Sequence, residues 1–204
     1  MADSFQKLCE IAKPDPRSEH WAIIDPDMGK LRMIKIEDIY SQLEKLELHT
    51  GVPKQVRTHF DTTRNLFLYS WFVYRFMPVA EWHASASLEL ALKIKSNEKK
   101  KGLRKLIELA IENGWIKNEG VSVWKSAKQS YEQRKVMMEE FFNQIKSETT
   151  QVYNSEFDYD YIEVLKDTIP PIRNVYAHGK NFLHGGAYLQ LQIVSDFINQ
   201  LFED

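Results

Sequence analysis

The sequence predicts an all-α fold that carries a small β-hairpin at its N-terminal end. Two patterns lead to this prediction: apolar residues recur at helical spacing from Glu37 onward, and two short β-prone runs precede them on either side of a turn. The chain has 204 residues, of which 43% are hydrophobic and 12% aromatic, a composition typical of a packed globular protein. The change of pattern divides the chain into an N-terminal extension, residues 1–36, and a helical domain, residues 37–204.

The charge and the cysteine content limit the classes of function. The net charge is −2 and the isoelectric point is near 6.3, which argues against a protein held on nucleic acid mainly by bulk charge, although a local basic groove is compatible with it. A single cysteine, Cys9, can form neither an intrachain disulfide nor a multi-cysteine zinc site. The N-terminus has no apolar core of signal-peptide length, and the apolar run at 66–80 is too short to span a bilayer. We therefore expect a cytoplasmic protein with no membrane segment.

The hairpin is predicted from residues 21–25 and 30–36, which flank the turn Pro26-Asp27-Met28-Gly29. The first helix should follow it and end at Gly51. A second helix should begin at Pro53 and end or kink at Pro78. The remaining helices are expected at 79–96, 103–114, 122–146, 157–176 with an interruption by two prolines, and 187–202.

Several common catalytic motifs are missing. The glycines form neither a dinucleotide-binding fingerprint nor a phosphate-binding P-loop, and there is no G-x-S-x-G elbow or H-E-x-x-H zinc motif. A metal site built from His178, His184 and a distant carboxylate is conceivable, but no spacing favours it over ordinary polar roles for these histidines. We expect neither a cofactor nor a metal ion.

The segment RNVYAHG, residues 173–179, is the strongest candidate for a functional site. Arg173, Asn174 and His178 lie at the end of a predicted helix, just after Pro170 and Pro171. Histidine titrates near neutral pH and can move protons, whereas arginine stays charged and binds phosphate through two parallel hydrogen bonds. Together with a polar asparagine, these groups suit metal-independent RNA cleavage, in which the ribose 2′-hydroxyl is the nucleophile. The alternative is structural: Arg173 pairs with a helix carboxylate and His178 caps the helix end.

A basic stretch, residues 93–105, holds seven lysines and arginines against one glutamate. Such a stretch is either a solvated turn between helices or a patch that contacts phosphates. The side chains that could contact RNA phosphates are Lys99, Lys100, Lys101, Arg104 and, beside the motif, Lys180.

RNVYAHG resembles the R-(N/D/H)-x-x-x-H motif of the HEPN superfamily, the higher eukaryote and prokaryote nucleotide-binding domains. WHASASLELALKIK at 82–95 and KGLRKLIELAIENGWI at 101–116 are similar to two further helices of that superfamily, and the similarity covers residues 53–204. The resemblance implies an up-and-down helical bundle that pairs as a homodimer, with a shared site at the interface. If this chain works as the active members do, Arg173 would stabilise the phosphate, His178 would act as acid and base, and Asn174 would assist the arginine.

Two functions follow from this resemblance. The first is a metal-independent endoribonuclease, such as a toxin or anti-phage defence component, with RNA as substrate and an antitoxin protein as a partner. The second is a catalytically inactive HEPN-type module that binds a protein partner or a nucleotide. The sequence identifies neither the RNA target, nor a cognate antitoxin, nor the role of residues 1–36.

Overall fold

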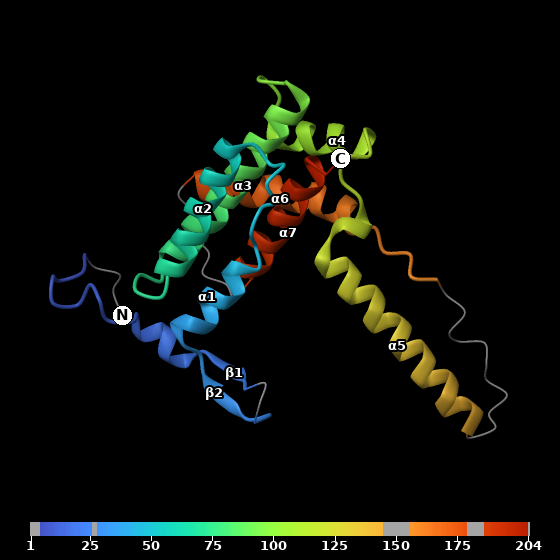
Figure 1. Cartoon of the computed structure of the whole chain (residues 1–204), viewed down its shortest axis with the longest axis horizontal. Helices are drawn as coiled ribbons and strands as arrows, with labels where there is room; N and C mark the ends of the chain where they lie inside the picture. Colours follow the sequence, from blue (N-terminus) through green and yellow to red (C-terminus); the bar gives the residue numbers. More distant parts are fainter. Residues whose placement is uncertain (1–4, 26–27, 145–155, 179–185, 204) are drawn as a thin grey trace.

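The structure, a computed structural model, describes residues 5–25, 28–144, 156–178 and 186–203 (Figure 1). These residues form a mostly helical fold with one two-stranded antiparallel sheet, as the sequence predicts. The elements in chain order are η1 (Pro16–His20), β1 (Ala22–Ile24), β2 (Leu31–Met33), α1 (Ile36–Glu44), α2 (Lys54–Tyr69), α3 (Phe76–Ser96), α4 (Leu103–Glu112), η2 (Asn118–Gly120), α5 (Ser122–Gln144), α6 (Tyr161–Ala177) and α7 (Ala187–Leu201).

The N-terminal hairpin is tied to the helical body by one arginine. β1 and β2 pair with Ile23 opposite Arg32. The Arg32 guanidinium bonds Asp25 at 2.9 Å and Asp38, in the first turn of α1, at 2.7 Å. A two-stranded ribbon is marginal alone, so this ion-pair network fixes the hairpin against α1.

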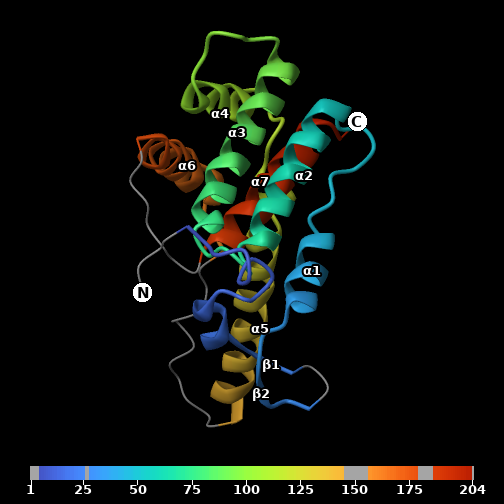
Figure 2. The same ribbon diagram turned by 90° about the vertical axis from the view of Figure 1, so that its left-hand side faces the viewer.

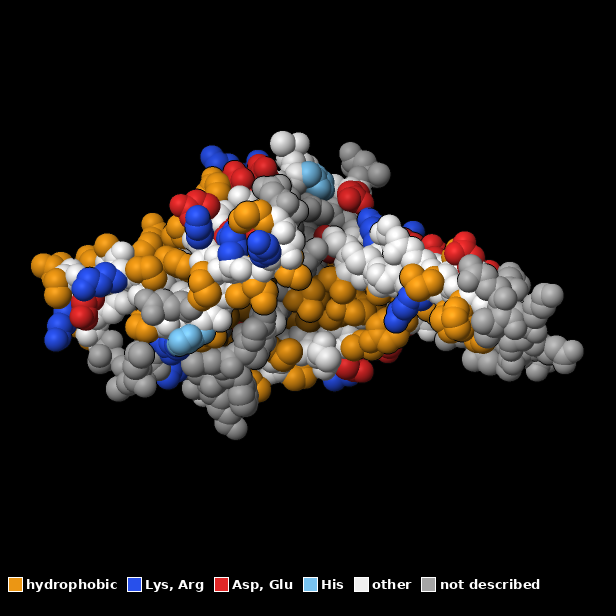
Figure 3. Space-filling view, turned by 90° about the horizontal axis from the view of Figure 1, so that it is seen from below, with side chains coloured by type: hydrophobic (Ala, Val, Ile, Leu, Met, Phe, Trp, Pro, Cys, Tyr) orange, Lys and Arg blue, Asp and Glu red, His pale blue; other side chains and the backbone are white. Residues whose placement is uncertain are grey.

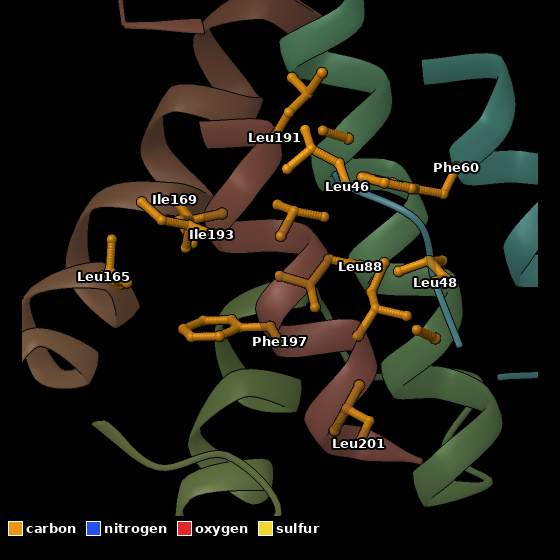
Figure 4. Packing of buried hydrophobic residues seen from close by; sticks show 14 of the residues in the cluster. Leu46, Leu48, Phe60, Leu88, Leu165, Ile169, Leu191, Ile193, Phe197 and Leu201 are labelled. Atoms are coloured by element: carbon orange, nitrogen blue, oxygen red, sulfur yellow. The ribbon is translucent and has the colours of Figure 1, made fainter. Parts of the chain in front are cut away.

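Helix α3 lies at the centre of the fold. It packs against α2, α4, α6 and α7, and Figure 2 shows these helices gathered around it. Its small residues Ala80, Ala84 and Ala91 are fully buried and allow the neighbouring helices to approach closely. The core is filled by large apolar side chains: Leu88 of α3 itself, Phe60 of α2, and Leu191, Phe197 and Leu201 of α7 (Figure 4).

The boundary between α2 and α3 differs from the sequence prediction. α2 ends at Tyr69, a short turn follows, and α3 begins at Phe76 with Pro78 in its first turn. A proline in the first turn costs no hydrogen bond, because that N–H has no intrahelical partner in any case. Pro78 therefore does not end the second helix. The apolar run at 66–80 is divided between these two helices, and no described helix has the length and apolar character needed to cross a membrane.

Helix α6 also differs from the prediction, because it continues through Pro170 and Pro171 without interruption. The side chain of Asp160 caps its first turn by accepting a hydrogen bond from the Glu163 N–H at 3.1 Å. Pro170 is buried and Pro171 is exposed. The two missing N–H groups leave the carbonyls of Lys166 and Asp167 without their usual helical donors.

Helix α5 leaves the body of the molecule. Its N-terminal end is fixed to α7, since Ser122 donates from its backbone N–H and its hydroxyl to the Asp196 carboxylate at 2.8 Å each. Figure 1 shows the rest of α5 extending away from the other helices.

Candidate functional site

The C-terminal part of α6 lies on α3 through one face. Ile169, Arg173 and Tyr176 are separated by four and then three residues, which places them on the same side of the helix. Ile169 is buried in the core, and the Tyr176 hydroxyl donates a 2.5 Å hydrogen bond to Glu81 of α3. Burial and this carboxylate raise the pKa of Tyr176 well above its ordinary value, so the hydroxyl stays protonated. This contact fixes the RNVYAHG segment against α3.

Arg173 is paired with a carboxylate of α3. Its Nη2 lies 3.1 Å from Oε2 of Glu89, whose other oxygen, Oε1, accepts a 2.7 Å bond from Lys93. The Glu89 side chain is only 15% exposed. One carboxylate between two cations leaves a net positive charge at this position.

A pocket of about 600 Å³ opens beside this pair. Arg173, Asn174 and Pro170 line it from α6, Glu89 lines it from α3, and residues 100–105 line it from the loop before α4 and the first turn of that helix. The cations in its wall are Lys100, Lys101, Arg104, Lys105 and Arg173, against the acids Glu89 and Glu98. The structure therefore brings the motif and the basic stretch together, which the sequence leaves open.

The cations of this pocket are neutralised to different degrees. Lys101 lies 3.1 Å from Glu98, and Arg104 pairs with Asp167 of α6 and with Glu108. Lys100 and Lys105 form no ion pair with any residue that the structure describes. Two lysines of the wall are thus available to an anionic ligand.

His178 does not share this pocket. It is exposed at the C-terminal cap of α6, and its backbone N–H donates to the Asn174 carbonyl at 3.0 Å. Positions five residues apart on a helix differ in direction by about 140°. Because α6 runs without a break to Ala177, Arg173 and His178 are not brought together within one chain. The arrangement contains both features of the structural alternative, a paired Arg173 and a histidine at the helix cap.

The other predicted residues fall into three groups. Asn174 accepts a 3.3 Å hydrogen bond from Arg173 and lines the pocket. Lys99 is exposed in the loop before α4 and is not part of the lining. Lys180 and His184 lie outside the described residues.

Glu89 was not singled out from the sequence, and Lys93 and Lys105 were included in the basic stretch 93–105 without being named as phosphate contacts. The Glu89–Lys93 pair has the i, i+4 spacing of a helical ion pair, which is a detectable signal. The contact between Glu89 and Arg173 spans 84 residues and has no local signature.

A second polar cluster lies between α2 and α3. The rings of His59 and His83 stack with centroids 4.1 Å apart. His59 Nδ1 lies 2.7 Å from the buried Ser87 hydroxyl, and His83 Nδ1 lies 2.9 Å from the buried Thr63 hydroxyl. Burial, with a smaller effect of the neighbouring His59, lowers the pKa of His83 from 6.5 to about 4. Burial also lowers the pKa of His59, so both rings are neutral at pH 7.

The structure contains no group of three or more histidine, cysteine, aspartate or glutamate side chains placed to hold a metal ion, within the ranges that it describes. A comparison with protein families, curated proteins and solved structures finds no match to this chain.

Proposed function

We propose that this protein is a metal-independent endoribonuclease of the HEPN type. The observation that carries the proposal is the shared pocket, in which Arg173 and Asn174 of the motif meet Lys100, Lys101, Arg104 and Lys105. Guanidinium and ammonium groups at a concave surface are suited to bind the phosphates of RNA. The slightly acidic charge of the whole chain does not prevent this, because the cations are concentrated in one place.

In the proposed reaction the ribose 2′-oxygen attacks the adjacent phosphorus and the bond to the 5′-oxygen breaks. The 2′-hydroxyl loses its proton to a base, and the leaving 5′-oxygen gains a proton from an acid; His178 would serve in these transfers. Arg173 would stabilise the additional negative charge on the phosphate in the transition state. The products are a 2′,3′-cyclic phosphate and a free 5′-hydroxyl.

A homodimer would complete this site. Arg173 faces the pocket and His178 is exposed on another side of α6, so one chain offers the phosphate-binding group without the acid–base group beside it. A second copy that places its His178 at the mouth of this pocket would bring the two groups together. This arrangement agrees with the shared interface that the resemblance implies.

The test is RNA cleavage by the purified protein in EDTA, with Arg173→Ala and His178→Ala beside the wild type. We expect the wild type to leave 2′,3′-cyclic phosphate ends, and each substitution to lower the rate by a factor of about 100 or more. Arg134→Ala and His20→Ala change the same residue types at exposed positions outside the pocket and should leave the rate unchanged. Equal loss in the controls, or cleavage that survives both motif substitutions, would refute the proposal.

The second candidate is an inactive HEPN-type module that binds a nucleotide or a protein partner. The Arg173–Glu89 ion pair favours it, because a carboxylate of the same chain already engages the guanidinium. A folded wild type that cleaves no RNA but binds a labelled oligonucleotide, with affinity lost in Arg173→Ala, would support the module instead of the enzyme.

A further inference from the structure

Lys100 and Lys105 are the cations of the pocket beside Arg173 that no carboxylate of the described residues neutralises. Both lysines are exposed and line the pocket, and neither takes part in an ion pair there. The guanidinium of Arg173, by contrast, has Glu89 as a partner at 3.1 Å. The pocket therefore offers two kinds of cation to an anionic ligand: an arginine held in position by a carboxylate, and two lysines whose charge is fully available.

These lysines line a different part of the wall from Arg173. Arg173 projects from α6, whereas Lys100 lies in the loop before α4 and Lys105 in the first turn of that helix. An ion pair between Arg104 of α4 and Asp167 of α6 links the two parts of the wall. The pocket between them holds about 600 Å³, of which one phosphate fills only a small part. A ligand that uses both kinds of cation at once therefore fits best if it carries more than one anionic group.

The remaining lining of the pocket is suited to a nucleic acid backbone more than to bases. No aromatic side chain on which a base could stack is among the lining residues. The polar side chains of the lining are those of lysine, arginine and glutamate, together with the amide of Asn174. A nucleic acid strand carries one negative charge per nucleotide, so consecutive phosphates match a wall of this kind. On the face that Figure 3 shows, lysine and arginine side chains are instead interspersed with acidic and hydrophobic ones.

We propose that Lys100 and Lys105 bind a phosphate of the RNA next to the phosphate that is cleaved at Arg173. The inference deepens the proposed function and rests on it, since the RNA and its scissile phosphate come from that proposal. It narrows the substrate class to strands with at least two consecutive phosphodiesters. The flanking phosphate keeps its charge throughout the reaction, so the lysines bind substrate and transition state equally. They should therefore lower KM and leave kcat unchanged.

Binding is tested with a 2′-O-methyl trinucleotide, which cannot be cleaved because its 2′-oxygens are blocked. A matched trinucleotide has a neutral methylphosphonate in place of one of the two phosphodiesters, and isothermal titration calorimetry measures both with the full-length chain. The wild type should bind the fully charged trinucleotide about tenfold more tightly, and added salt should reduce this preference. Lys100→Ala/Lys105→Ala should bind the two analogues equally, because Arg173 then engages the one phosphate that both of them carry.

The matched control is Lys30→Ala/Lys45→Ala, which removes the same charge from two exposed lysines outside the pocket. It should keep the wild-type preference, and circular dichroism should show both double variants folded. In the cleavage assay, Lys100→Ala/Lys105→Ala should raise the KM of an RNA trinucleotide about tenfold at unchanged kcat. The proposal is overturned if the wild type binds neither analogue or both equally, if the control loses the preference, or if the lysine variant lowers kcat at unchanged KM.

The phosphate site and the ribonuclease fail in different ways. If the wild type cleaves RNA while Lys100→Ala/Lys105→Ala keeps both the wild-type KM and the preference for the charged trinucleotide, the phosphate site is refuted and the ribonuclease stands. If the wild type cleaves no RNA but shows a preference that depends on these lysines, the ribonuclease is refuted and the phosphate site belongs to a binding module.

Discussion

His83 illustrates how a single half-buried ring makes the stability of the fold depend on pH. Its imidazole is stacked on His59 and hydrogen-bonded to Thr63, a position where a positive charge would be poorly solvated and close to a second imidazole. The folded chain therefore keeps this ring neutral at pH values where an unfolded chain would protonate it.

This difference predicts a loss of stability in mild acid. Between pH 6.5 and about 4 the unfolded state binds a proton at His83 that the folded state does not, so the free energy of unfolding falls as the pH is lowered through this range. We expect His83 to contribute roughly 2 kcal/mol of this loss, a figure reduced for its partial exposure to solvent. Urea unfolding of the wild type and of His83→Gln at pH 7 and pH 5 measures it.

His20→Gln serves as the control, because His20 is exposed and should keep the full pH dependence of the wild type. An equal slope in His83→Gln and the wild type would show that the stacked pair does not control acid stability.

For single residues, the sequence indicates which side chains are chemically useful, but not which other side chains they contact. RNVYAHG and the basic stretch were recognisable as candidates, and the structure places Arg173 and Lys100 in one pocket. The pairing of Arg173 with Glu89 depends on the packing of α6 on α3 and has no local pattern. The role of His178 could not be derived either, because in the proposed site it depends on a second chain.

Among the elements, α6 tolerates two consecutive prolines that usually disturb a helix. Their backbone angles are compatible with a helix, and the cost is the loss of two hydrogen bonds and crowding against the preceding turn. Pro170 is buried and lines the pocket, which gives it a packing role, whereas Pro171 is exposed. Pro171 therefore adds the cost without an evident compensating contact.

We accordingly expect Pro171→Ala to stabilise the protein. The alanine N–H can donate a hydrogen bond to the Asp167 carbonyl, and the crowding against the preceding turn is relieved. This gain in stability should exceed the loss that comes from a more flexible unfolded chain, so the free energy of unfolding should rise by about 1 kcal/mol. Differential scanning calorimetry should show a rise in Tm of about 2–4 °C. Pro170→Ala is the comparison, since it removes a buried ring and should give no such rise. A lower Tm for Pro171→Ala would mean that the proline pair stabilises α6.

The elements themselves were largely predictable, and most of the errors concern proline. The hairpin, the helix after Gly102 and the last helix were confirmed because their apolar periodicity and end signals agree. Two errors concern proline: Pro78 begins α3 rather than ending α2, and Pro170 and Pro171 do not interrupt α6. A proline changes the local cost of a helix, but tertiary packing decides whether that cost is tolerated. A third error concerns the first helix, which ends at Glu44 and not at Gly51, with Leu46 and Leu48 buried in the segment that follows it.

For the whole molecule, the main consequence of the fold is the separation of the two central motif residues. α6 directs Arg173 into the pocket beside α3 and α4 and leaves His178 exposed at its end. A site that uses both groups in one reaction then needs a second copy of the chain. Two-fold symmetry would form two such sites, each with Arg173 from one subunit and His178 from the other.

Mixing two inactive variants tests this claim most directly. Arg173→Ala and His178→Ala are unfolded together, refolded at equal amounts, and assayed for RNA cleavage in EDTA. Half of the dimers then contain one chain of each kind, and each of these has one intact composite site, so the mixture should recover about a quarter of the wild-type rate. Either variant refolded alone should stay inactive. A mixture as inactive as its components, beside an active wild type, would contradict a shared site, and an inactive wild type would contradict the ribonuclease itself.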